Sequence, residues 1–366
     1  MTKVLMISTD RKILEEGSPI RARMLDYAGL FDELHVVVFA KKEAGTAPFA
    51  IGNLSVYPTN SLSKLLYVRD ATAIGSSIIR DSGFVAGDSV ITTQDPFETG
   101  LVGKTLSEKF GLPLHIQIHT DFYSPYFKDS VLNRIRIALS NRTLPKASAI
   151  RAVSERIKRS LPLDLQAKAS VLPIFADVTA IEGAPVPVGF RQKHPRFAKM
   201  AVVASRLTKE KDIGSALEAF AAAKKESPEA GLVVVGSGPE EGKLKSKVQS
   251  LGLADWVVFE PWAERATVIS YMKTADAFLS SSLYEGYGLS MLEAHSSGAT
   301  LVVTDAGIAP ELTTFLCSPG DVSCLSRRLS EALLGAKGNK PYVYPYPSKE
   351  AYLAAHKADI ERAIGS

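Results

Sequence analysis

The chain has 366 residues, of which 46% are hydrophobic and 22% are charged, and its formal net charge is +4. This composition is typical of a globular protein, and the length is sufficient for two domains with separate cores. No apolar run approaches the roughly 20 residues that span a bilayer. Residues 1–10 become polar too quickly for a signal peptide and predict a first buried strand. Cys317 and Cys324 are too few for a disulfide framework or a zinc site, so we expect reduced cysteines in a cytoplasmic protein.

Short apolar runs alternate with helical patterns, which is typical of parallel sheets covered by helices. In the first half, strands are predicted at 4–7, 35–39, 89–92, 114–118, 149–153 and 170–172. In the second half, strands are predicted at 200–204, 232–235, 257–259, 277–279 and 301–304. Residues 183–195 between the halves are polar and rich in proline and glycine, which indicates a linker. We therefore predict an α/β protein with two Rossmann-like domains, at 1–180 and 197–345, joined by a linker at 181–196.

Two polar segments follow predicted strands of the first domain. Asp95 comes after the strand at 89–92, and we expect it to cap the next helix. Glu98 is either an acceptor contact or a solvated side chain. His119 directly follows the strand at 114–118, where open sheets of this kind bind ligands. An imidazole there can donate to a ligand hydroxyl or stabilise developing positive charge, although a histidine after a buried strand is more often structural.

Basic side chains are concentrated between Tyr126 and Leu161. Nine cations stand against Asp129 and Glu155, a local excess of about +7. The cations are Lys128, Arg134, Arg136, Arg142, Lys146, Arg151, Arg156, Lys158 and Arg159. Such a stretch could contact anionic lipid or a phosphorylated acceptor, and a solvated surface explains it about equally well. Nucleic acid is not an expected partner, because no aromatic platform or known binding module accompanies the charge.

Two segments of the second domain have residues that suit phosphate binding. Arg206 and Lys211 lie five residues apart after a predicted strand. Together they could neutralise a diphosphate leaving group without a metal ion, although this spacing alone is usually ordinary surface charge. Gly236 and Gly238 follow the next strand and precede a helix that begins near Glu240. These glycines let the backbone approach a ligand, and a plain tight turn explains them equally well.

Glu285 and Glu293 enclose a glycine-flanked aromatic residue in the segment E-G-Y-G-L-S-M-L-E. A helix is predicted to begin near Leu289 and to end at Gly298. Glu285 would then lie at the mouth of the helix and Glu293 one turn inside, with exposed amides between them. This pattern suits a ligand with hydroxyls at both ends and phosphates in the middle, such as a nucleotide sugar. Two glutamates eight positions apart are also common on solvated helices.

The segment 285–294 resembles the E-x7-E motif of retaining glycosyltransferases with the GT-B fold, notably family 4. The resemblance implies that Glu285 contacts the donor sugar, that Glu293 holds the ribose hydroxyls, and that the turn between them meets the sugar and diphosphate through its backbone. The residues of this turn are Gly286, Tyr287, Gly288 and Leu289, with Tyr287 where the family often has Phe. The resemblance also implies that the two domains face each other across a cleft, and that a final helix within 346–366 packs back on the first domain.

Other segments of the second domain resemble the same family. The segment that contains Arg206 and Lys211 resembles its G-R-L-x-x-x-K-G motif, which implies that both cations bind the donor diphosphate. The turn with Gly236 and Gly238 resembles its V-G-x-G-P turn beside the donor nucleotide. Residues 257–262 match the stretch that holds the base, but they do not distinguish uracil, guanine and adenine.

Three more features are assigned by the resemblance, at His119, Gly17 and residues 307–311. His119 takes the place of a family histidine near the reacting carbon of the donor. Gly17 is what remains of a glycine pair beside the donor phosphates, and Arg21 and Arg23 after it could bind an anionic acceptor. Residues 307–311 resemble a glycine-rich turn whose amides approach the diphosphate. The match is poorest around Gly17, which leaves the acceptor contacts open.

The resemblance predicts a retaining, metal-independent glycosyltransferase of the hexosyltransferase type that uses no cofactor. Its donor would be a nucleoside diphosphate sugar, and its acceptor a lipid-linked or saccharide hydroxyl in glycolipid, polysaccharide or other glycoconjugate synthesis. No carboxylates are evident as the nucleophile and acid of a retaining glycosidase, so we expect front-face attack with the leaving phosphate accepting the acceptor's proton. The expected location is the cytoplasm, at the inner face of the membrane if the basic stretch binds lipid. A nucleotide-sugar epimerase and a non-catalytic glycosyltransferase-like subunit stay open as alternatives.

Overall fold

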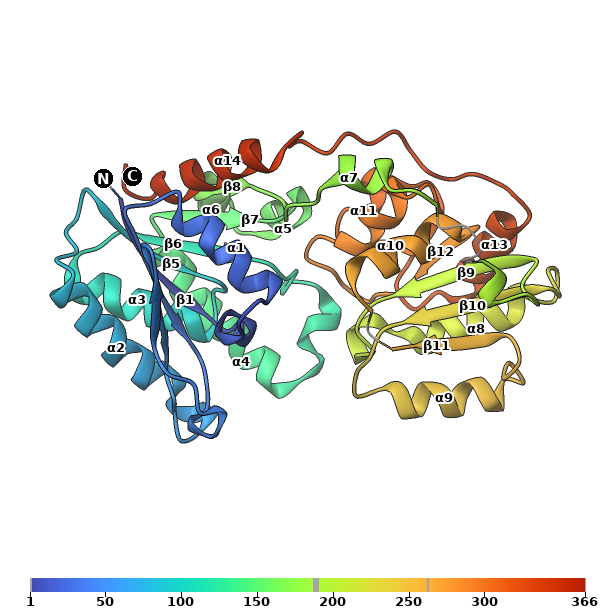
Figure 1. Ribbon diagram of the computed structural model, residues 1–366, viewed down its shortest axis with the longest axis horizontal. Helices are drawn as coiled ribbons and strands as arrows, with labels where there is room; N and C mark the ends of the chain where they lie inside the picture. The colour runs from blue at the N-terminus through green and yellow to red at the C-terminus, as the bar shows by residue number, and fades with distance from the viewer. Residues whose placement is uncertain (1, 187–190, 262, 366) are drawn as a thin grey trace. The chain divides into compact units, whose positions relative to one another are not determined.

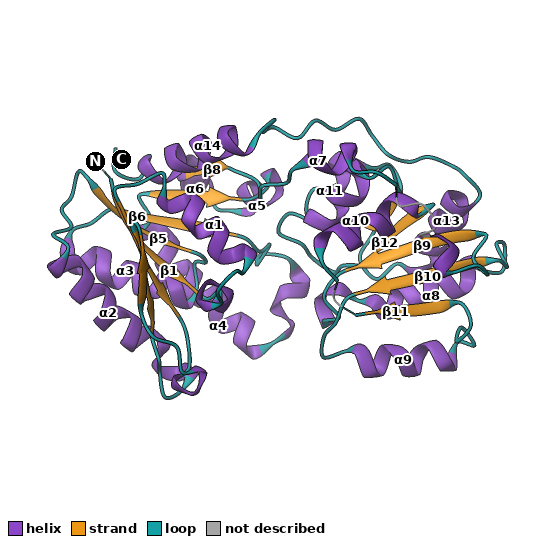
Figure 2. Cartoon of the chain, in the orientation of Figure 1, coloured by secondary structure: helices purple, strands orange, loops and turns teal. Residues whose placement is uncertain are grey.

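The computed structural model describes residues 2–186, 191–261 and 263–365. The chain divides into two compact units, one made of Met1–Pro173 with Ser348–Ser366 and the other of Ile174–Pro347. In each unit, helices lie on both sides of a mainly parallel sheet (Figures 1 and 2). The predicted α/β class with two Rossmann-like units is therefore confirmed. How the two units face each other stays a prediction, and Trp262, from the expected base-binding stretch, lies outside the described residues.

The first unit has the strand order β3-β4-β2-β1-β5-β6-β7-β8, with β3 antiparallel to β4 and the other pairs parallel. Its strands are Lys3–Ser8 (β1), Glu33–Val38 (β2), Phe49–Ile51 (β3), Leu54–Pro58 (β4), Ser89–Thr93 (β5), Leu114–Ile118 (β6), Ala149–Ala152 (β7) and Ala169–Val171 (β8). Its α-helices are Pro19–Ala28 (α1), Tyr67–Asp81 (α2), Glu98–Phe110 (α3), Val131–Thr143 (α4), Glu155–Ser160 (α5), Leu163–Lys168 (α6) and Lys349–Glu361 (α14). Short 3-10 helices span Arg11–Leu14, Lys42–Ala44, Lys64–Leu66, Pro125–Asp129 and Leu144–Lys146.

The second unit has the strand order β11-β10-β9-β12-β13-β14, and its strand pairs are parallel. Its strands are Lys199–Ala204 (β9), Ala230–Val235 (β10), Val257–Glu260 (β11), Ala277–Ser280 (β12), Thr300–Thr304 (β13) and Leu316–Cys317 (β14). Its α-helices are Val178–Gly183 (α7), Ile213–Ala223 (α8), Glu241–Ser250 (α9), Arg265–Thr274 (α10), Leu289–Ser296 (α11), Ala309–Leu312 (α12) and Val322–Leu333 (α13). Short 3-10 helices span Arg191–Lys193 and Lys209–Lys211.

The strands form where apolar residues follow one another almost without interruption, which suits parallel strands that are buried on both faces. Alternate residues of a strand point to the same face, so Ala201 and Val203 of β9 share one side of the second sheet. On that side they belong to one buried core with Phe220 of α8, Leu244 of α9 and Leu329 of α13. The same arrangement leaves the loops at the strand ends free to carry polar side chains.

Every strand predicted from the sequence is present, but β3, β4 and β14 were missed. β3 and β4 form a hairpin in which Ile51 pairs with Leu54 across Gly52 and Asn53. Gly52 has a φ of 59°, which a glycine adopts without strain. A Gly-Asn pair between alternating apolar residues is a hairpin signal, so the sequence did contain evidence for these two strands. β14 has two residues, too few to produce a periodic pattern.

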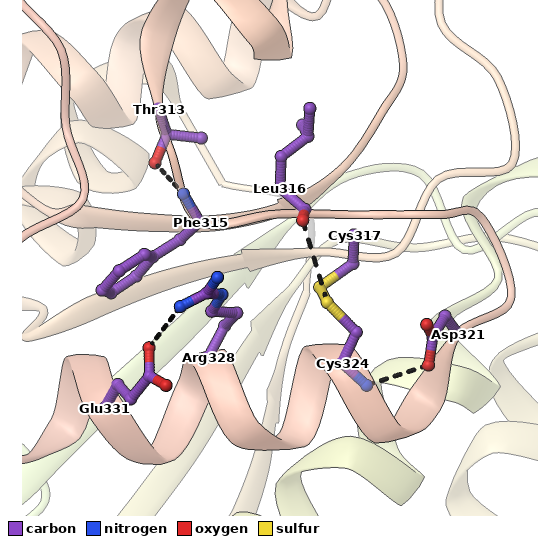
Figure 3. The surroundings of a disulfide bond; sticks show 8 residues. All are labelled: Thr313, Phe315, Leu316, Cys317, Asp321, Cys324, Arg328 and Glu331. Carbon is purple, nitrogen blue, oxygen red and sulfur yellow. Dashed lines mark hydrogen bonds and ion pairs between the residues drawn. A yellow bond between two sulfur atoms is a disulfide. The ribbon is translucent and has the colours of Figure 1, made fainter.

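Cys317 and Cys324 form a disulfide between β14 and the first turn of α13 (Figure 3). Their Cα atoms are 5.7 Å apart, within the range that a disulfide can bridge. The Asp321 side chain caps α13 by accepting from the backbone N–H of Cys324 at 2.9 Å. The expectation of reduced cysteines is therefore wrong for this structure, because a turn between a strand and a helix brings together two thiols that are seven positions apart.

Candidate functional site

The strand order places a topological switch point between β9 and β12 in the second unit. From β9 the chain continues to β10 and β11 on one side, and from β12 it continues to β13 and β14 on the other. The loops that follow β9 and β12 diverge from this point, which is where open parallel sheets bind ligands. These two loops carry Arg206, Lys211 and Glu285. The fold therefore places three of the sequence-predicted site residues at one sheet edge.

Hydrogen bonds join the loops after β9 and β12. The Ser281 hydroxyl donates to the carbonyls of Lys211 and Asp212 at 2.9 and 2.8 Å. The backbone N–H of Leu283 donates to the carbonyl of Glu210 at 2.8 Å. Asp212 has a φ of 43° at the start of α8, so the chain turns sharply directly after Lys211. These bonds hold the two loops in one position relative to each other.

Lys211 and Glu285 form an ion pair, in which the ammonium donates to Oε1 of the carboxylate. The side chains are each 13% exposed, so water screens the pair only weakly. The Ser282 hydroxyl also donates to Glu285 Oε1, at 2.8 Å. With both bonds on Oε1, Oε2 of Glu285 has no partner among the described residues and can accept from a ligand hydroxyl.

Arg206 lies on the same loop as Lys211 but is more open to solvent. Its side chain is 66% exposed, and its guanidinium donates to Glu210 Oε1 at 3.1 Å. The Thr208 hydroxyl donates to the same oxygen at 2.7 Å. An exposed guanidinium with one weak carboxylate partner can reorient toward a phosphate at little cost.

The glycines after β10 are required by contact with the loop that carries Arg206. A Cβ on Gly236 would lie 1.9 Å from the carbonyl oxygen of Ser205, and a Cβ on Gly238 would lie 2.3 Å from that of Leu207. Gly236 also has a φ of 149°, in the region that favours glycine. The backbone N–H of Leu207 donates to the carbonyl of Ser237 at 2.9 Å. These glycines therefore fix the position of the Arg206 loop, a role that the sequence did not distinguish from a contact with nucleotide.

The turn before α11 is anchored by the Tyr287 ring, which is 3% exposed. The backbone carbonyl of Tyr287 accepts from the backbone N–H of Ile308 at 2.9 Å, and a Cβ on Gly307 would lie 2.2 Å from that carbonyl oxygen. Gly288, with a φ of 94°, directly precedes Leu289 at the start of α11. No side chain of the described residues caps this helix, so its first amides can bind an anion. The buried ring of Tyr287 therefore holds the turn, and only the backbone of Tyr287 is available to a ligand. Gly286 connects this backbone to Glu285.

Glu293 lies one turn inside α11, as predicted, and is 9% exposed. Arg265, at the start of α10, donates from Nε to Glu293 Oε1 at 2.8 Å. Burial raises the pKa of Glu293, and the neighbouring Arg265 guanidinium opposes that shift. Sequence reasoning did not identify Arg265, because nothing near it in the sequence indicates that α10 lies beside α11.

His119 and Gly17 belong to the first unit. His119 follows β6, as predicted, and its Nε2 lies 3.1 Å from Oε1 of Gln117. Loss of hydration lowers the pKa of His119 to about 3, and the charge on Arg151 acts in the same direction.

Gly17 lies in an exposed turn before α1 with a φ of 71°. Arg21 donates to the carbonyls of the preceding 3-10 helix, at 3.0 Å to Ile13 and 2.5 Å to Leu14, so it helps to hold this turn. The other candidate cation there, Arg23, lies 4.0 Å from the Asp10 carboxylate.

Asp95 does not cap α3 as expected, since the residue at the cap position is Phe97. Instead Asp95 Oδ1 accepts from the backbone N–H of Phe97 at 2.7 Å, one residue before the helix. Burial raises the pKa of Asp95 to about 6. Glu98 accepts from Arg136 Nε at 3.1 and 3.2 Å, so its carboxylate is ion-paired, and its contact with an acceptor stays a prediction.

The basic stretch 126–161 is not one continuous surface. Arg151 is 2% exposed and lies in the core of the first unit, so the prediction that it belongs to a basic surface is wrong. A charge count cannot show this, because burial depends on the fold. The exposed cations are Lys128, Arg134, Arg142, Lys146 and Arg159. Three of these, Lys128, Arg134 and Arg142, lie on α4 or just before it, where Val131, Leu132 and Ile135 are 72%, 53% and 53% exposed. Among the described helices, none combines the length and the hydropathy needed to cross a membrane.

The chain is similar to known proteins in sequence and in fold. Residues 190–341 match the family model of the glycosyl transferases group 1. The alpha-monoglucosyldiacylglycerol synthase of Streptococcus pneumoniae is 29% identical over 225 residues, which cover 58% of this chain and 51% of that protein. The 2-deoxystreptamine glucosyltransferase of Streptomyces kanamyceticus is 24% identical over 249 residues, 64% of each chain. The chain thus spans about half to two thirds of the length of these curated relatives.

Solved structures show the same fold. The complex of Anabaena HepE with UDP and glucose has a TM-score of 0.68 at 19% identity and covers 100% of this chain and 95% of HepE. The sucrose-phosphate synthase of Thermosynechococcus elongatus has a TM-score of 0.74 at 17% identity, with 100% and 94% covered. The match to the glycosyl transferases group 1 family thus lies in the second unit, and the fold of the chain is that of the GT-B glycosyltransferases.

Proposed function

We propose that this protein is a retaining glycosyltransferase that moves a hexose from a nucleoside diphosphate sugar to an acceptor hydroxyl. The observation that carries the proposal is the ion pair of Lys211 and Glu285 at the switch point of the second unit, beside the uncapped start of α11. Cationic groups, helix amides and a carboxylate with one unoccupied oxygen are the groups that a diphosphate joined to a sugar requires.

Each part of the donor has a matching group. The amides at the start of α11, with Arg206 and Lys211, would bind the diphosphate. Oε2 of Glu285 would accept from a sugar hydroxyl, and Glu293 would accept from the ribose hydroxyls. Because the HepE complexes contain UDP, with glucose or as UDP-glucose, a uridine diphosphate sugar is the first donor class to test.

In the reaction, the bond between C1 of the sugar and the phosphate oxygen breaks while the acceptor oxygen bonds to C1 from the same face. The acceptor's proton passes to the leaving phosphate, so the products are the glycoside and a nucleoside diphosphate. Lys211 and Arg206 would stabilise the charge that develops on the phosphate, so metal independence stays part of the proposal. Glu285 and Glu293 are each held by a cationic side chain, an arrangement that suits binding of hydroxyls better than donation of protons.

We also propose that α4 brings the protein to an anionic membrane, where a lipid-linked acceptor would be available. Val131 and Ile135 are four residues apart on one face of the helix, and both are exposed. Lys128, Arg134 and Arg142 can approach lipid phosphates while the apolar side chains enter the interface. The relative named alpha-monoglucosyldiacylglycerol synthase supports a glycolipid product, and the relative named 2-deoxystreptamine glucosyltransferase supports a small saccharide-like acceptor as the alternative.

The test begins with the donor. Thermal unfolding with UDP, GDP and ADP, and then with their sugars, should show stabilisation by one nucleotide class. Slow hydrolysis of the stabilising donor, or its transfer to an added acceptor, should release the nucleoside diphosphate with the anomeric configuration retained, as read by proton NMR. Conversion of the donor without nucleotide release would favour the epimerase alternative, and binding without any turnover would favour the non-catalytic subunit. An inverted product would overturn the retaining mechanism.

A further inference from the structure

The C-terminal helix α14 covers a polar face of the first sheet. On β6, His115 and Gln117 alternate with apolar residues and continue to His119, so the three share one face. His115 and Gln117 are 0% and 5% exposed. Polar groups buried this deeply require hydrogen-bond partners, and α14 supplies one of them, Asp359, to His115.

One chain of hydrogen bonds runs from α14 to the end of β6. His115 Nε2 lies 3.0 Å from Asp359 Oδ2, and its Nδ1 lies 2.9 Å from the Thr92 hydroxyl. Gln117 Nε2 donates to that hydroxyl at 3.2 Å. Gln117 Oε1 lies 3.1 Å from His119 Nε2. Asp359 is thus connected to His119 through buried groups of β5 and β6.

Arg151 of β7 supplies the second fixed point of this network. Its Nη1 donates to Gln117 Oε1 at 3.1 Å, and its Nη2 donates to the Tyr352 hydroxyl of α14 at 2.8 Å. His356 Nδ1, also on α14, lies 3.4 Å from Arg151 Nη1. A guanidinium can only donate, so the Gln117 atom that faces it must be the carbonyl oxygen.

This orientation of Gln117 determines which nitrogen of His119 carries the proton. The carbonyl oxygen of Gln117 can only accept, so His119 must donate to it from Nε2. The pKa of His119 is lowered to about 3, chiefly by loss of hydration, so the ring is neutral at pH 7 and has a single N–H. Its Nδ1 is then an acceptor, with no partner among the described residues.

The Asp359 end is equally constrained. Burial opposes ionisation of Asp359, but the hydrogen bonds from His115 and Ser170 and the nearby charges of His115 and Arg151 together outweigh it and hold the pKa of the carboxyl well below its usual range. Ser170 and Arg362 also donate to its Oδ1. Asp359 is therefore an ionised acceptor, and His115 donates to it from Nε2.

We propose that Asp359, His115, Gln117 and Arg151 are positioning residues that hold His119 as the Nε2–H tautomer, so that Nδ1 accepts a hydrogen bond from a substrate hydroxyl. This inference rests on the proposed function for the role of His119, and it replaces one of the two alternatives drawn from the sequence, in which His119 donates to that hydroxyl. The C-terminal helix thereby acts on the reaction without contacting the substrate.

The proposal is tested by determining the tautomer of His119 in the full chain labelled with ¹⁵N-histidine. Long-range proton–nitrogen NMR spectra at neutral pH should show His119 as the Nε2–H tautomer. Gln117→Leu removes the acceptor, and the spectrum should then show both tautomers of His119, with kcat about 10- to 100-fold lower and KM for the donor little changed. Gln117→Glu keeps an acceptor in place and should restore the Nε2–H form. Asp359→Asn should shift the His115 resonances and move His119 in the same direction as Gln117→Leu, by less.

Glu33→Gln is the matched control, because Glu33 is also the carboxylate partner of a histidine, at 2.9 Å from His35 Nε2. It should change the His35 resonances and leave those of His119 unchanged. An Nδ1–H tautomer in the native protein, or unchanged His119 resonances in Gln117→Leu, would overturn the proposal. The spectra need no substrate, so the tautomer of His119 is measured independently of donor turnover. Absence of turnover would count against the proposed function and would not change the result for the tautomer.

Discussion

Lys211 and Glu285, 74 positions apart in the sequence, form an ion pair where the loops after β9 and β12 meet. The ammonium and the Ser282 hydroxyl both bind Oε1 of the carboxylate, which directs Oε2 away from them. The pair therefore couples a cation suited to phosphate with a carboxylate suited to a sugar hydroxyl, within one unit of the chain.

Lys211→Ala should lower kcat by about 10²- to 10³-fold, because it removes a charge that stabilises the leaving phosphate. It should also lower the free energy of unfolding by about 1–3 kcal/mol, since Glu285 is left largely buried without its cation. Donor turnover and urea unfolding measure the two effects. Lys245→Ala breaks an exposed pair with Glu241 and should change neither by much. Equal effects in the two variants would contradict the role of Lys211.

Glu293→Gln should change stability and donor binding in opposite directions. Burial raises the pKa of Glu293 above its value in the unfolded chain, so the protonated carboxyl favours folding below the unfolded pKa, and this gain is lost as pH rises through the folded pKa. A neutral amide should therefore leave the unliganded protein as stable at pH 7 or more so. Donor affinity should fall by about 1.5–3 kcal/mol, because a charged acceptor is lost. Thermal unfolding measures the change in stability, and calorimetric titration with the donor nucleotide measures the change in affinity.

Arg265→Ala should destabilise the protein more at pH 7 than at pH 4. The guanidinium opposes the rise in the pKa of Glu293, so its loss matters only while the carboxyl is ionised. Thermal midpoints of the variant and the native protein at the two pH values give the comparison. A pH-independent difference would mean that Arg265 stabilises the protein by packing alone.

Gly236→Ala should lower the free energy of unfolding by more than about 2 kcal/mol and weaken donor binding, because the added Cβ would meet the backbone of the Arg206 loop. Gly242→Ala is the control. Gly242 lies in α9, and a Cβ there has no atom within 4 Å, so this change should raise the free energy of unfolding by about 0.5–1 kcal/mol. Urea unfolding of the two variants should thus shift in opposite directions.

Val131→Ser with Ile135→Ser should weaken binding to vesicles that contain an anionic lipid, because both side chains are exposed on the face of α4 that we assign to the membrane. Sedimentation with anionic and with zwitterionic vesicles measures the effect, which should decrease with added salt if the cations contribute. Leu163→Ser is the control, since Leu163 is 83% exposed on α6. Equal binding to both kinds of vesicle would contradict an electrostatic contact.

Much of the fold follows from local sequence. Continuous apolar runs such as Val4 to Ile7 predict buried parallel strands, and the glycines around Tyr287 predict the turn before α11. These signals are local because strand and turn propensities depend on residues that are close in the chain. The hairpin of β3 and β4 was missed although the Gly52-Asn53 pair is a turn signal, so the local sequence did contain the information that predicts it.

By itself, then, the sequence determined the α/β class, the strands other than β3, β4 and β14, the positions of Arg206, Lys211 and Glu285 after strands, and that of Glu293 inside α11. Only the tertiary structure decided which side chains meet. It paired Arg265 with Glu293, buried Arg151 beneath α14, joined Cys317 to Cys324, and connected His119 to a helix more than 200 positions away. The physical reason is that such contacts depend on how helices pack over a sheet, and residue type and spacing along the chain do not record that packing.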